Sequence, residues 1–359
     1  MATAAGIKLH QQQNCTSNDL RYTQWLNMSS LGIKRAVPAI ALFFVAPLVA
    51  EFLLGDLPIK LLGALVVLAP MYGGGALLIR ELVRRTGRGW PSIFVLAFAY
   101  AVFEEAFTTQ TLFNPNYLHL NLHLLQPAYI PSLGIGAWWT IFVLTLHTVW
   151  SISTSIALVE ALVPERATTP WLGGIGLTAT GILFVLGSVA STAMEIKQDH
   201  YVASTPQFVV SAIVCIVAII AAFRLPSTAS VRTAAWVPSP WLVGAGALLA
   251  GSVFLMIPNG WGWLAVLIYV LLDLAVIGAV FIFSHRKGWD GRHRLALAAG
   301  AALTYAWHAF IQKPAVGSGG IGFRIGNAIF AASLIALLFV AARRTAYESS
   351  ARATLESAA

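Results

Sequence analysis

The sequence has few charged residues. Only 10% of its 359 residues are aspartate, glutamate, lysine or arginine, whereas a soluble domain of this size carries about a quarter. Hydrophobic residues make up 58% of the chain, and the mean hydropathy is +0.77. This composition excludes an ordinary soluble domain and predicts an all-α protein made of membrane-spanning helices. Because the spans and their short connections use up the length, we expect no separate soluble domain.

Cysteine and the common phosphate-binding and metal-binding motifs are also scarce. The two cysteines, Cys15 and Cys215, lie far apart in the sequence, so neither a disulfide framework nor a zinc–cysteine cluster is expected. The sequence contains no Walker-type phosphate loop, no serine nucleophile elbow, no HExxH zinc motif and no haem-attachment motif. These absences argue against an ATP-driven pump and against several common classes of hydrolase.

Long apolar runs, in contrast, are frequent. A transmembrane helix needs about 20 mainly apolar residues, and ten segments of the chain fit that description. Tryptophans stand at the start of several of these segments, as is typical of residues at a membrane interface. The predicted spans are 36–55, 58–79, 90–112, 136–163, 171–194, 206–224, 240–258, 261–284, 294–313 and 322–342.

The positions of the basic residues predict the orientation of the bundle. With the amino terminus inside, nearly all arginines and lysines fall on the cytoplasmic side, as the positive-inside rule requires. We therefore expect both termini in the cytoplasm of a multi-pass cell-membrane protein, in a bacterial plasma membrane. The net charge of +8 follows from this topology, so nucleic-acid binding is not expected. The predicted parts are a polar segment over 1–33, a membrane domain over 34–345 and a disordered tail over 346–359.

Two adjacent glutamates lie in the third predicted span, within "FAYAVFEEAFTTQ". A carboxylate at the centre of a span costs roughly 2.5–3.5 kcal/mol, so it usually faces a protein interior or a water-filled cavity. Helical spacing places Glu104 on one face with Tyr100 and Thr108. Glu104 and Glu105 should not both be ionised there, because burial and like-charge repulsion each disfavour the second charge. We expect one of them to be protonated near neutral pH, or a histidine or bound cation to compensate the charge.

Two later spans carry histidines that could join this pair. The fourth span aligns His147 with Ser151 on one face, and the ninth aligns His308 with Gln312. The third and fourth spans run in opposite directions, and a helix rises about 1.5 Å per residue. Glu104 and His147 are therefore expected roughly 13 and 16 Å from the outer surface. They could meet at that depth.

An uncharged segment follows the third span. Residues 113–135 are interrupted by proline and are too broken to cross the membrane. His119 and His123 within it are a weak metal signal, because a zinc site usually has at least three protein ligands. We expect this segment to form a cap on the outer side of the glutamate pair.

A glutamate pair in one span, followed by histidines in later spans, resembles the CAAX-protease and bacteriocin-processing family of intramembrane proteases. That family carries a glutamate-pair motif and two histidine motifs on separate helices. Glu104-Glu105, His147 and His308 with Gln312 stand at the corresponding places. The resemblance implies a hydrolase of membrane-embedded peptides in which Glu104 or Glu105 activates a water. His147 and His308 would then bind a divalent metal or stabilise the oxyanion.

Two other functions are compatible with the sequence. Ten spans divide into five plus five, which would give the inverted halves of a proton-coupled secondary transporter with a small-molecule substrate. In that interpretation Tyr100-x-x-x-Glu104 in the third span corresponds to Tyr269-x-x-x-Asp273 in the eighth. The other alternative is a structural membrane subunit whose polar residues bind a partner helix.

Overall fold

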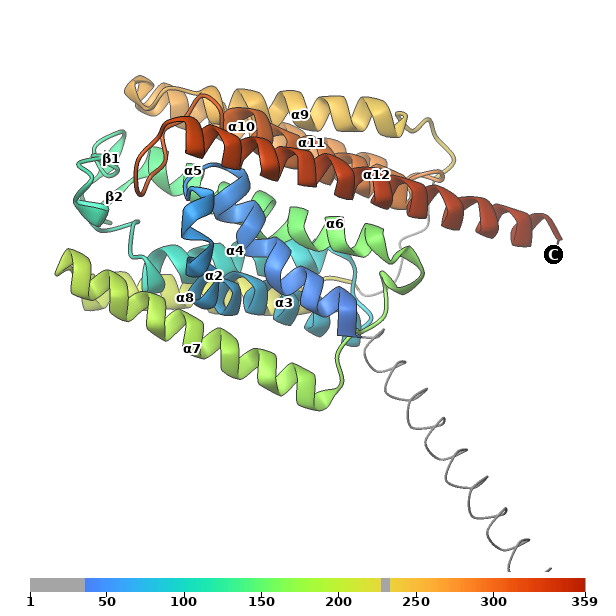
Figure 1. Ribbon diagram of the computed structural model, residues 1–359, viewed down its shortest axis with the longest axis horizontal. Coiled ribbons are helices and arrows are strands. Elements are labelled where there is room, and N and C mark those ends of the chain that lie inside the picture. The colour runs from blue at the N-terminus through green and yellow to red at the C-terminus, as the bar shows by residue number, and fades with distance from the viewer. Residues whose placement is uncertain (1–35, 227–232, 359) are drawn as a thin grey trace, which may run out of the picture.

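The computed structural model describes residues 36–226 and 233–358. Its helices run side by side along one long axis (Figure 1). Eight of them are long and apolar enough to cross a membrane, and the prediction of an all-α polytopic membrane protein is confirmed. These eight are Ala36–Leu53, Ile59–Arg85 (containing α2, Leu65–Leu68, and α3, Gly74–Arg85), Trp90–Thr108 (containing α4, Trp90–Phe103), Ala137–Leu162 (containing α5, Ala137–Leu146, and α6, Ser155–Leu162), α7 (Gly174–Asp199), α8 (Thr205–Arg224), α10 (Trp263–Ser284) and α12 (Ile321–Ala358).

Two further helices complete the set. α9 (Pro240–Met256) is a shorter apolar helix, and α11 (Gly291–His308) lies between α10 and α12 in the chain. A helix therefore stands at each of the ten segments expected from the sequence. The predicted boundaries differ from the observed ones by only a few residues in most cases.

Two boundaries differ for identifiable reasons. The third span ends at Thr108 instead of 112, because the chain leaves the helix while still buried, and residues 110–114 remain inside the protein. Irregular backbone at membrane depth is tolerated where protein surrounds it. α12 continues to Ala358, where a disordered tail was expected from 346. Its final residues are rich in alanine, glutamate and arginine, which favour helix, and contain neither glycine nor proline.

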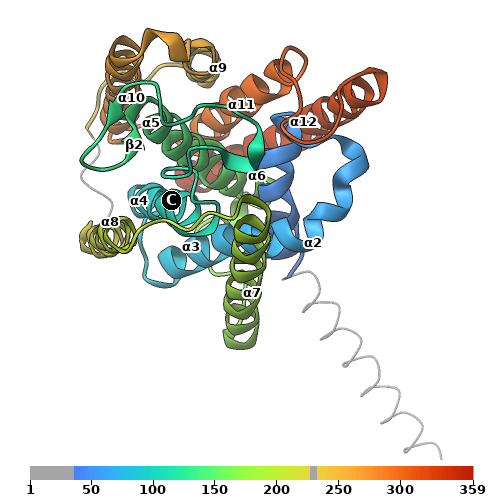
Figure 2. The ribbon, with the colours of Figure 1, turned by 90° about the vertical axis from the view of Figure 1, so that its left-hand side faces the viewer.

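The third and fourth spans form the centre of the bundle. Trp90–Thr108 and Ala137–Leu162 bury most of their side chains, whereas α7, α8, α10 and α12 bury few. The view along the long axis places α7, α8 and α10 around the outside (Figure 2). The peripheral helices thus present apolar side chains outward, as expected of surfaces that face lipid. The central spans carry the polar residues.

The two ends of the bundle differ in character. At one end lies a short antiparallel hairpin of β1 (Tyr129–Ile130) and β2 (Ile135–Gly136). We call this the hairpin end. Arg80, Arg84 and Arg88 lie at the other end, where α6 ends (Figure 1) and where Arg80 and Arg84 contact Glu160; we call this the arginine end. The first described span, Ala36–Leu53, begins at the arginine end, and α12 ends there (Figure 1), which is consistent with an even number of crossings.

The outer segment predicted over 113–135 lies at the hairpin end and is fastened to the end of α7. The Asn114 side-chain amide donates to Asp199 Oδ2 at 2.6 Å, and the Leu118 backbone N–H donates to the same carboxylate at 3.0 Å. His119 Nε2 lies 3.0 Å from the Gln198 carbonyl oxygen. The polar segment predicted over 1–33 lies outside the described residues.

Candidate functional site

The first four spans each contain a short π-helical stretch, and no other part of the described residues does. A π-helical turn inserts an extra residue into an α-helix and occurs frequently at functional sites. Each stretch here carries polar side chains of one cluster. The stretches and their residues are Leu48–Leu53 with Glu51, Ala69–Gly73 with Tyr72, Glu104–Thr108 with Glu104 and Glu105, and His147–Thr154 with His147 and Ser151.

Glu104, Glu105 and His147 meet at the centre of this cluster. His147 Nε2 lies 2.9 Å from Glu105 Oε1, and His147 Nδ1 lies 3.2 Å from Glu104 Oε2. One potential ligand atom from each residue lies within 4.8 Å of the other two. All three side chains are buried. The structure thus brings together the glutamate pair and the histidine that the sequence placed at matching depth.

Glu104 is buried, and its oxygens lack well-aligned hydrogen bonds. It is 1% exposed and neither carboxylate oxygen accepts a hydrogen bond of good geometry, although the Tyr72 and Tyr100 hydroxyls and His147 Nδ1 lie close to it. The nearby His147 Nδ1 is instead 3.0 Å from the Ser151 hydroxyl. The hydroxyls of Tyr100 and Thr108 are also buried and unpaired. Because buried polar groups are almost always hydrogen-bonded, these atoms make the space beside Glu104 a candidate position for a water molecule or a ligand.

Glu105, in contrast, is held by hydroxyl groups. Its Oε2 accepts hydrogen bonds from the side chains of Thr109, at 3.3 Å, and Thr111. Thr111 is oriented in turn by the Trp139 indole N–H, which donates to it at 2.9 Å. Oε2 is therefore fixed, and Oε1 is left facing His147.

Tyr72 connects this cluster to a second pair of acids nearer the hairpin end. Its ring stacks on His147 with centroids 5.9 Å apart, and its hydroxyl donates to Glu51 Oε1 at 2.6 Å. Beyond Glu51, Asp56 Oδ1 accepts a hydrogen bond from the Gln312 amide at 2.7 Å. Burial and the neighbouring charge of Glu51 raise the pKa of Asp56 to about 7, although the Gln312 hydrogen bond opposes the shift.

Several residues predicted for the site lie elsewhere. Within the described part of the chain, His308 does not belong to the group of potential ligands formed by Glu104, Glu105 and His147. Asp273 accepts a hydrogen bond from Thr145 at 2.9 Å, on the side of the fourth span that packs against α10. The predicted ligand pair of His147 and His308 therefore lacks support. Face alignment along single helices cannot show which faces of distant helices meet.

A buried ion cluster at the arginine end was missed by the sequence analysis. Arg84 binds Glu160 through two hydrogen bonds, Nε to Oε1 at 2.9 Å and Nη2 to Oε2 at 2.7 Å. Arg80 contacts Glu160 at 3.2 Å and Glu81 at 2.7 Å, and its guanidinium lies 3.3 Å from the centroid of the Trp171 ring. Glu160 lies near the end of its span, yet it is only 4% exposed. Adjacent Arg80 and Glu81 were the available signal, because a span end needs no acid beside its arginine.

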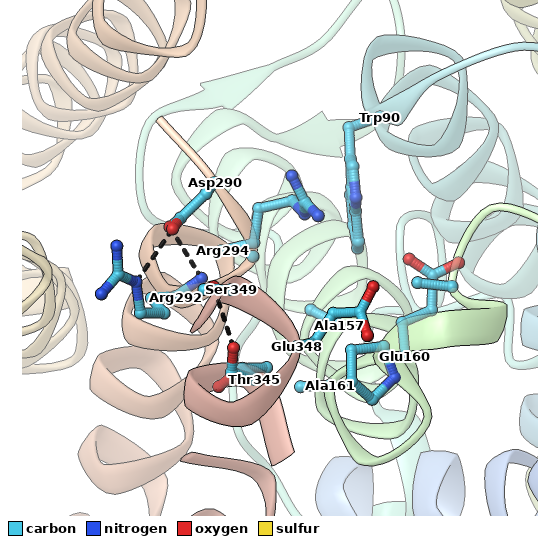
Figure 3. Close-up of a pocket in the computed structure, with 13 residues that line it drawn as sticks. Trp90, Ala157, Glu160, Ala161, Asp290, Arg292, Arg294, Thr345, Glu348 and Ser349 are labelled. Atoms are coloured by element: carbon cyan, nitrogen blue, oxygen red, sulfur yellow. Dashed lines mark hydrogen bonds and ion pairs between the residues drawn. The ribbon is translucent and has the colours of Figure 1, made fainter. Parts of the chain in front are cut away.

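A pocket of about 220 Å³ opens at the same end, between α6, α11 and α12 (Figure 3). Asp290 lies on its wall and caps α11, accepting from the Arg292 backbone N–H at 3.0 Å. Its side chain also contacts Arg292 Nε and His293 Nδ1, each at 2.8 Å. Burial raises the pKa of Asp290, but these hydrogen bonds outweigh it and hold the pKa below its usual value. The pocket includes none of Glu104, Glu105 and His147.

Comparison with known proteins assigns the family. Residues 40–350 match the model of an uncharacterized membrane protein family, and the chain belongs to it. No curated protein and no solved structure matches the chain. The membrane assignment from the sequence is therefore confirmed at the level of the family.

The resemblance to the CAAX-protease and bacteriocin-processing family is wrong, because the matching model is that of a different family. The sequence differs from that family's motifs at two places. Thr109 stands where the glutamate motif has arginine, and Phe142 precedes His147 by five residues instead of four. In the structure Thr109 donates a hydrogen bond to Glu105, so a local hydroxyl takes the place of a guanidinium. A glutamate pair and spaced histidines are too short a pattern to identify a family.

Proposed function

We propose that the protein is a membrane-embedded hydrolase that uses Glu104 to activate a water molecule. The observation that carries the proposal is the state of Glu104, which is buried beside Glu105 and His147 while both of its oxygens lack a hydrogen-bond donor. A water bound there would donate to Glu104. An unpaired Tyr100 hydroxyl is available to donate to a substrate oxygen.

The proposed step is the addition of water to a carbonyl carbon of a peptide or ester that lies in the bilayer. The water oxygen forms a bond to that carbon, and its proton passes to a Glu104 oxygen. The negative charge that develops on the carbonyl oxygen is stabilised by the Tyr100 hydroxyl. When the bond to the leaving nitrogen or oxygen breaks, Glu104 returns the proton to the leaving group. One water molecule is consumed for each bond cleaved, and the products are a carboxylic acid and the protonated leaving group.

The distribution of polar groups favours hydrolysis over transport between inverted halves. The glutamates, the histidine and all four π-helical stretches lie in the first four spans. Asp273, the expected counterpart of Glu104, pairs with Thr145.

The proposal is tested with the purified chain in lipid vesicles that contain membrane-spanning peptides and lipid esters. Mass spectrometry should detect cleavage products for the wild type, and Glu104→Gln should lower their rate of formation by about 10²-fold or more, because a general base contributes typically 10²–10⁴-fold. Asp273→Asn, a mid-span carboxylate outside the cluster, should retain the activity. Equal product formation by the wild type and Glu104→Gln would overturn the proposal.

Proton-coupled transport is a second candidate, favoured by the acids that lead from the cluster toward the hairpin end. Glu51 bonds Tyr72, and Asp56 bonds Gln312, so titratable groups continue beyond His147. In the same vesicles, a pH gradient that dissipates with the wild type and persists with Glu104→Gln, without cleavage products, would favour transport. A structural subunit would show neither effect.

A further inference from the structure

We infer that Glu104, Glu105 and His147 bind one divalent transition-metal ion of the Zn²⁺ or Mn²⁺ type. The three residues provide two carboxylates and one imidazole, which are ligands that these ions accept. Their potential ligand atoms lie within 4.8 Å of one another. In a tetrahedral site with bonds of about 2.1 Å, neighbouring ligand atoms are about 3.4 Å apart. Rotations of the two carboxylate side chains would reach that spacing. They start from 2.9 Å between His147 Nε2 and Glu105 Oε1 and from ligand atoms of all three residues within 4.8 Å of one another.

The charge of the site calls for a cation. Within residues 36–226 and 233–350, His147 is the only basic side chain that forms an ion pair with Glu104 or Glu105. When both glutamates are ionised, a neutral histidine leaves two adjacent carboxylates uncompensated in a buried site, and a protonated one leaves a net charge of about −1. A bound cation compensates this charge without protonation of a glutamate. Burying such a charge is costly unless it is paired or coordinates a metal.

The unpaired atoms point to the same conclusion independently. Glu104 is 1% exposed and has no hydrogen bond at either oxygen. One oxygen can ligate the ion while the other receives a proton from a bound water. A purely structural acid would be expected to have donors, as Glu160 has from Arg80 and Arg84.

The surrounding residues orient the ligands as in known metal sites. A metal-binding histidine almost always uses its second ring nitrogen for a hydrogen bond, and ligating carboxylates are themselves hydrogen-bonded. Here His147 Nδ1 lies 3.0 Å from the Ser151 hydroxyl, which leaves Nε2 for the ion. Thr109 and Thr111 hold Glu105 Oε2, which leaves Oε1. Three protein ligands and one open position for water form the arrangement of a catalytic metal site.

This inference names the group that would polarise the water in the proposed hydrolysis, and for that role it rests on the proposed function. The test measures binding alone. The purified full chain is stripped with a chelator, equilibrated separately with Zn²⁺, Mn²⁺ and Mg²⁺, and desalted. Bound metal is then measured by mass spectrometry. We expect one equivalent of Zn²⁺ or Mn²⁺ in the wild type, little Mg²⁺, and at least a 10-fold weaker affinity in Glu104→Gln and His147→Ala.

Controls separate this site from other ligands in the chain. His308→Ala and Asp273→Asn should bind metal as the wild type does, because both residues lie outside the cluster. Ser151→Ala should weaken binding by about 10- to 100-fold, as loss of such a hydrogen bond typically does, and should change the visible spectrum of the Co²⁺-loaded protein. Because Ser151→Ala keeps all three ligands, it still tests the metal site if a variant of one of the ligands fails to fold.

The outcomes distinguish the two proposals. If the protein binds metal but hydrolyses none of the substrates tested, the metal-site proposal stands and the hydrolase proposal is overturned. If the chelator-stripped protein still hydrolyses substrate in a Glu104-dependent manner, the hydrolase proposal stands and the metal-site proposal is overturned. Absence of stoichiometric metal in the wild type, or binding unchanged in both Glu104→Gln and His147→Ala, would also overturn it.

Discussion

At the scale of single residues, two buried glutamates show the difference between a structural and an available carboxylate. Glu160 accepts three hydrogen bonds from Arg80 and Arg84, so its charge is compensated by groups that remain in place. Glu104 is equally buried and accepts none. Their sequence contexts do not reveal this, because donors to a buried acid come from other helices. The structure is needed to separate the two roles.

The buried contacts of Glu160 predict a large effect on stability. Glu160→Gln removes the negative charge shared by two arginines and should lower the free energy of unfolding by about 3–5 kcal/mol, the typical cost of breaking a buried ion pair. Thermal and denaturant unfolding in detergent measure this change. Glu165→Gln, an exposed glutamate nearby, should change stability by less than about 0.5 kcal/mol. Equal effects of the two substitutions would contradict the assigned role.

Asp56 predicts a dependence of stability on pH. Its pKa is raised from 3.8 to about 7 in the folded protein, so the folded state binds the proton more tightly than the unfolded state. The stability that this group contributes is present below pH 4 and is lost as the pH rises toward 7. A shift of about three units corresponds to an upper limit of about 4 kcal/mol.

Asp56→Asn should remove that dependence while keeping the acceptor for Gln312. Unfolding midpoints of the variant and the wild type should therefore agree near pH 4 and diverge as the pH approaches 8, with the variant the more stable. A constant difference across this range would show that Asp56 is not the titrating group.

At the scale of helices, the sequence predicted which segments are helical and their order in the chain, but it did not predict where those helices are distorted. Hydropathy is a property of each segment, so the ten segments could be found without knowing their neighbours. The π-helical stretches could not be found in this way, because an inserted residue is stabilised by contacts between helices. Glu104–Thr108 reads as an ordinary part of an apolar span until His147 and Thr111 are placed beside it. The same limit applies to His308, which helical spacing aligned with Gln312 but which lies outside the described group of potential ligands.

Close packing between α9 and α11 gives a test at this scale. A Cβ atom at Gly300 would overlap the Gly244 carbonyl oxygen and lie 2.7 Å from Leu248 N, whereas one at Gly246 would meet nothing within 4 Å. Gly300→Ala should therefore lower the unfolding free energy by at least about 1–3 kcal/mol. Gly246→Ala should be neutral or slightly stabilising, because alanine favours helix. Unfolding curves of the two variants compare them directly, and equal stability would contradict the packing.

At the scale of the whole molecule, the charge pattern predicts the orientation of the bundle in the membrane. Both described ends lie at the arginine end, and the positive-inside rule assigns that end to the cytoplasm. The rule counted Arg80 and Arg84 correctly as charges on one side, but it could not show that they are buried in an ion cluster with Glu160.

Reporter fusions test the orientation. Fusions after Arg85, Arg232 and Arg344 should report a cytoplasmic location, and fusions within 115–130 an external one, because the hairpin end and the arginine end face opposite sides. A cytoplasmic signal from 115–130 would reverse the orientation of the bundle and place the glutamate pair nearer the inner surface.

The central claim is that Glu104 is buried for function and not for stability. The most direct test is the thermal unfolding midpoint of Glu104→Gln and wild type in detergent with a chelator present. The amide keeps the shape of the side chain and removes one charge from a buried site that has two carboxylates and one histidine. Our account predicts that Glu104→Gln unfolds at the same temperature as the wild type or at a higher one. A midpoint several degrees lower would show that Glu104 is a structural partner of His147, and would contradict the account.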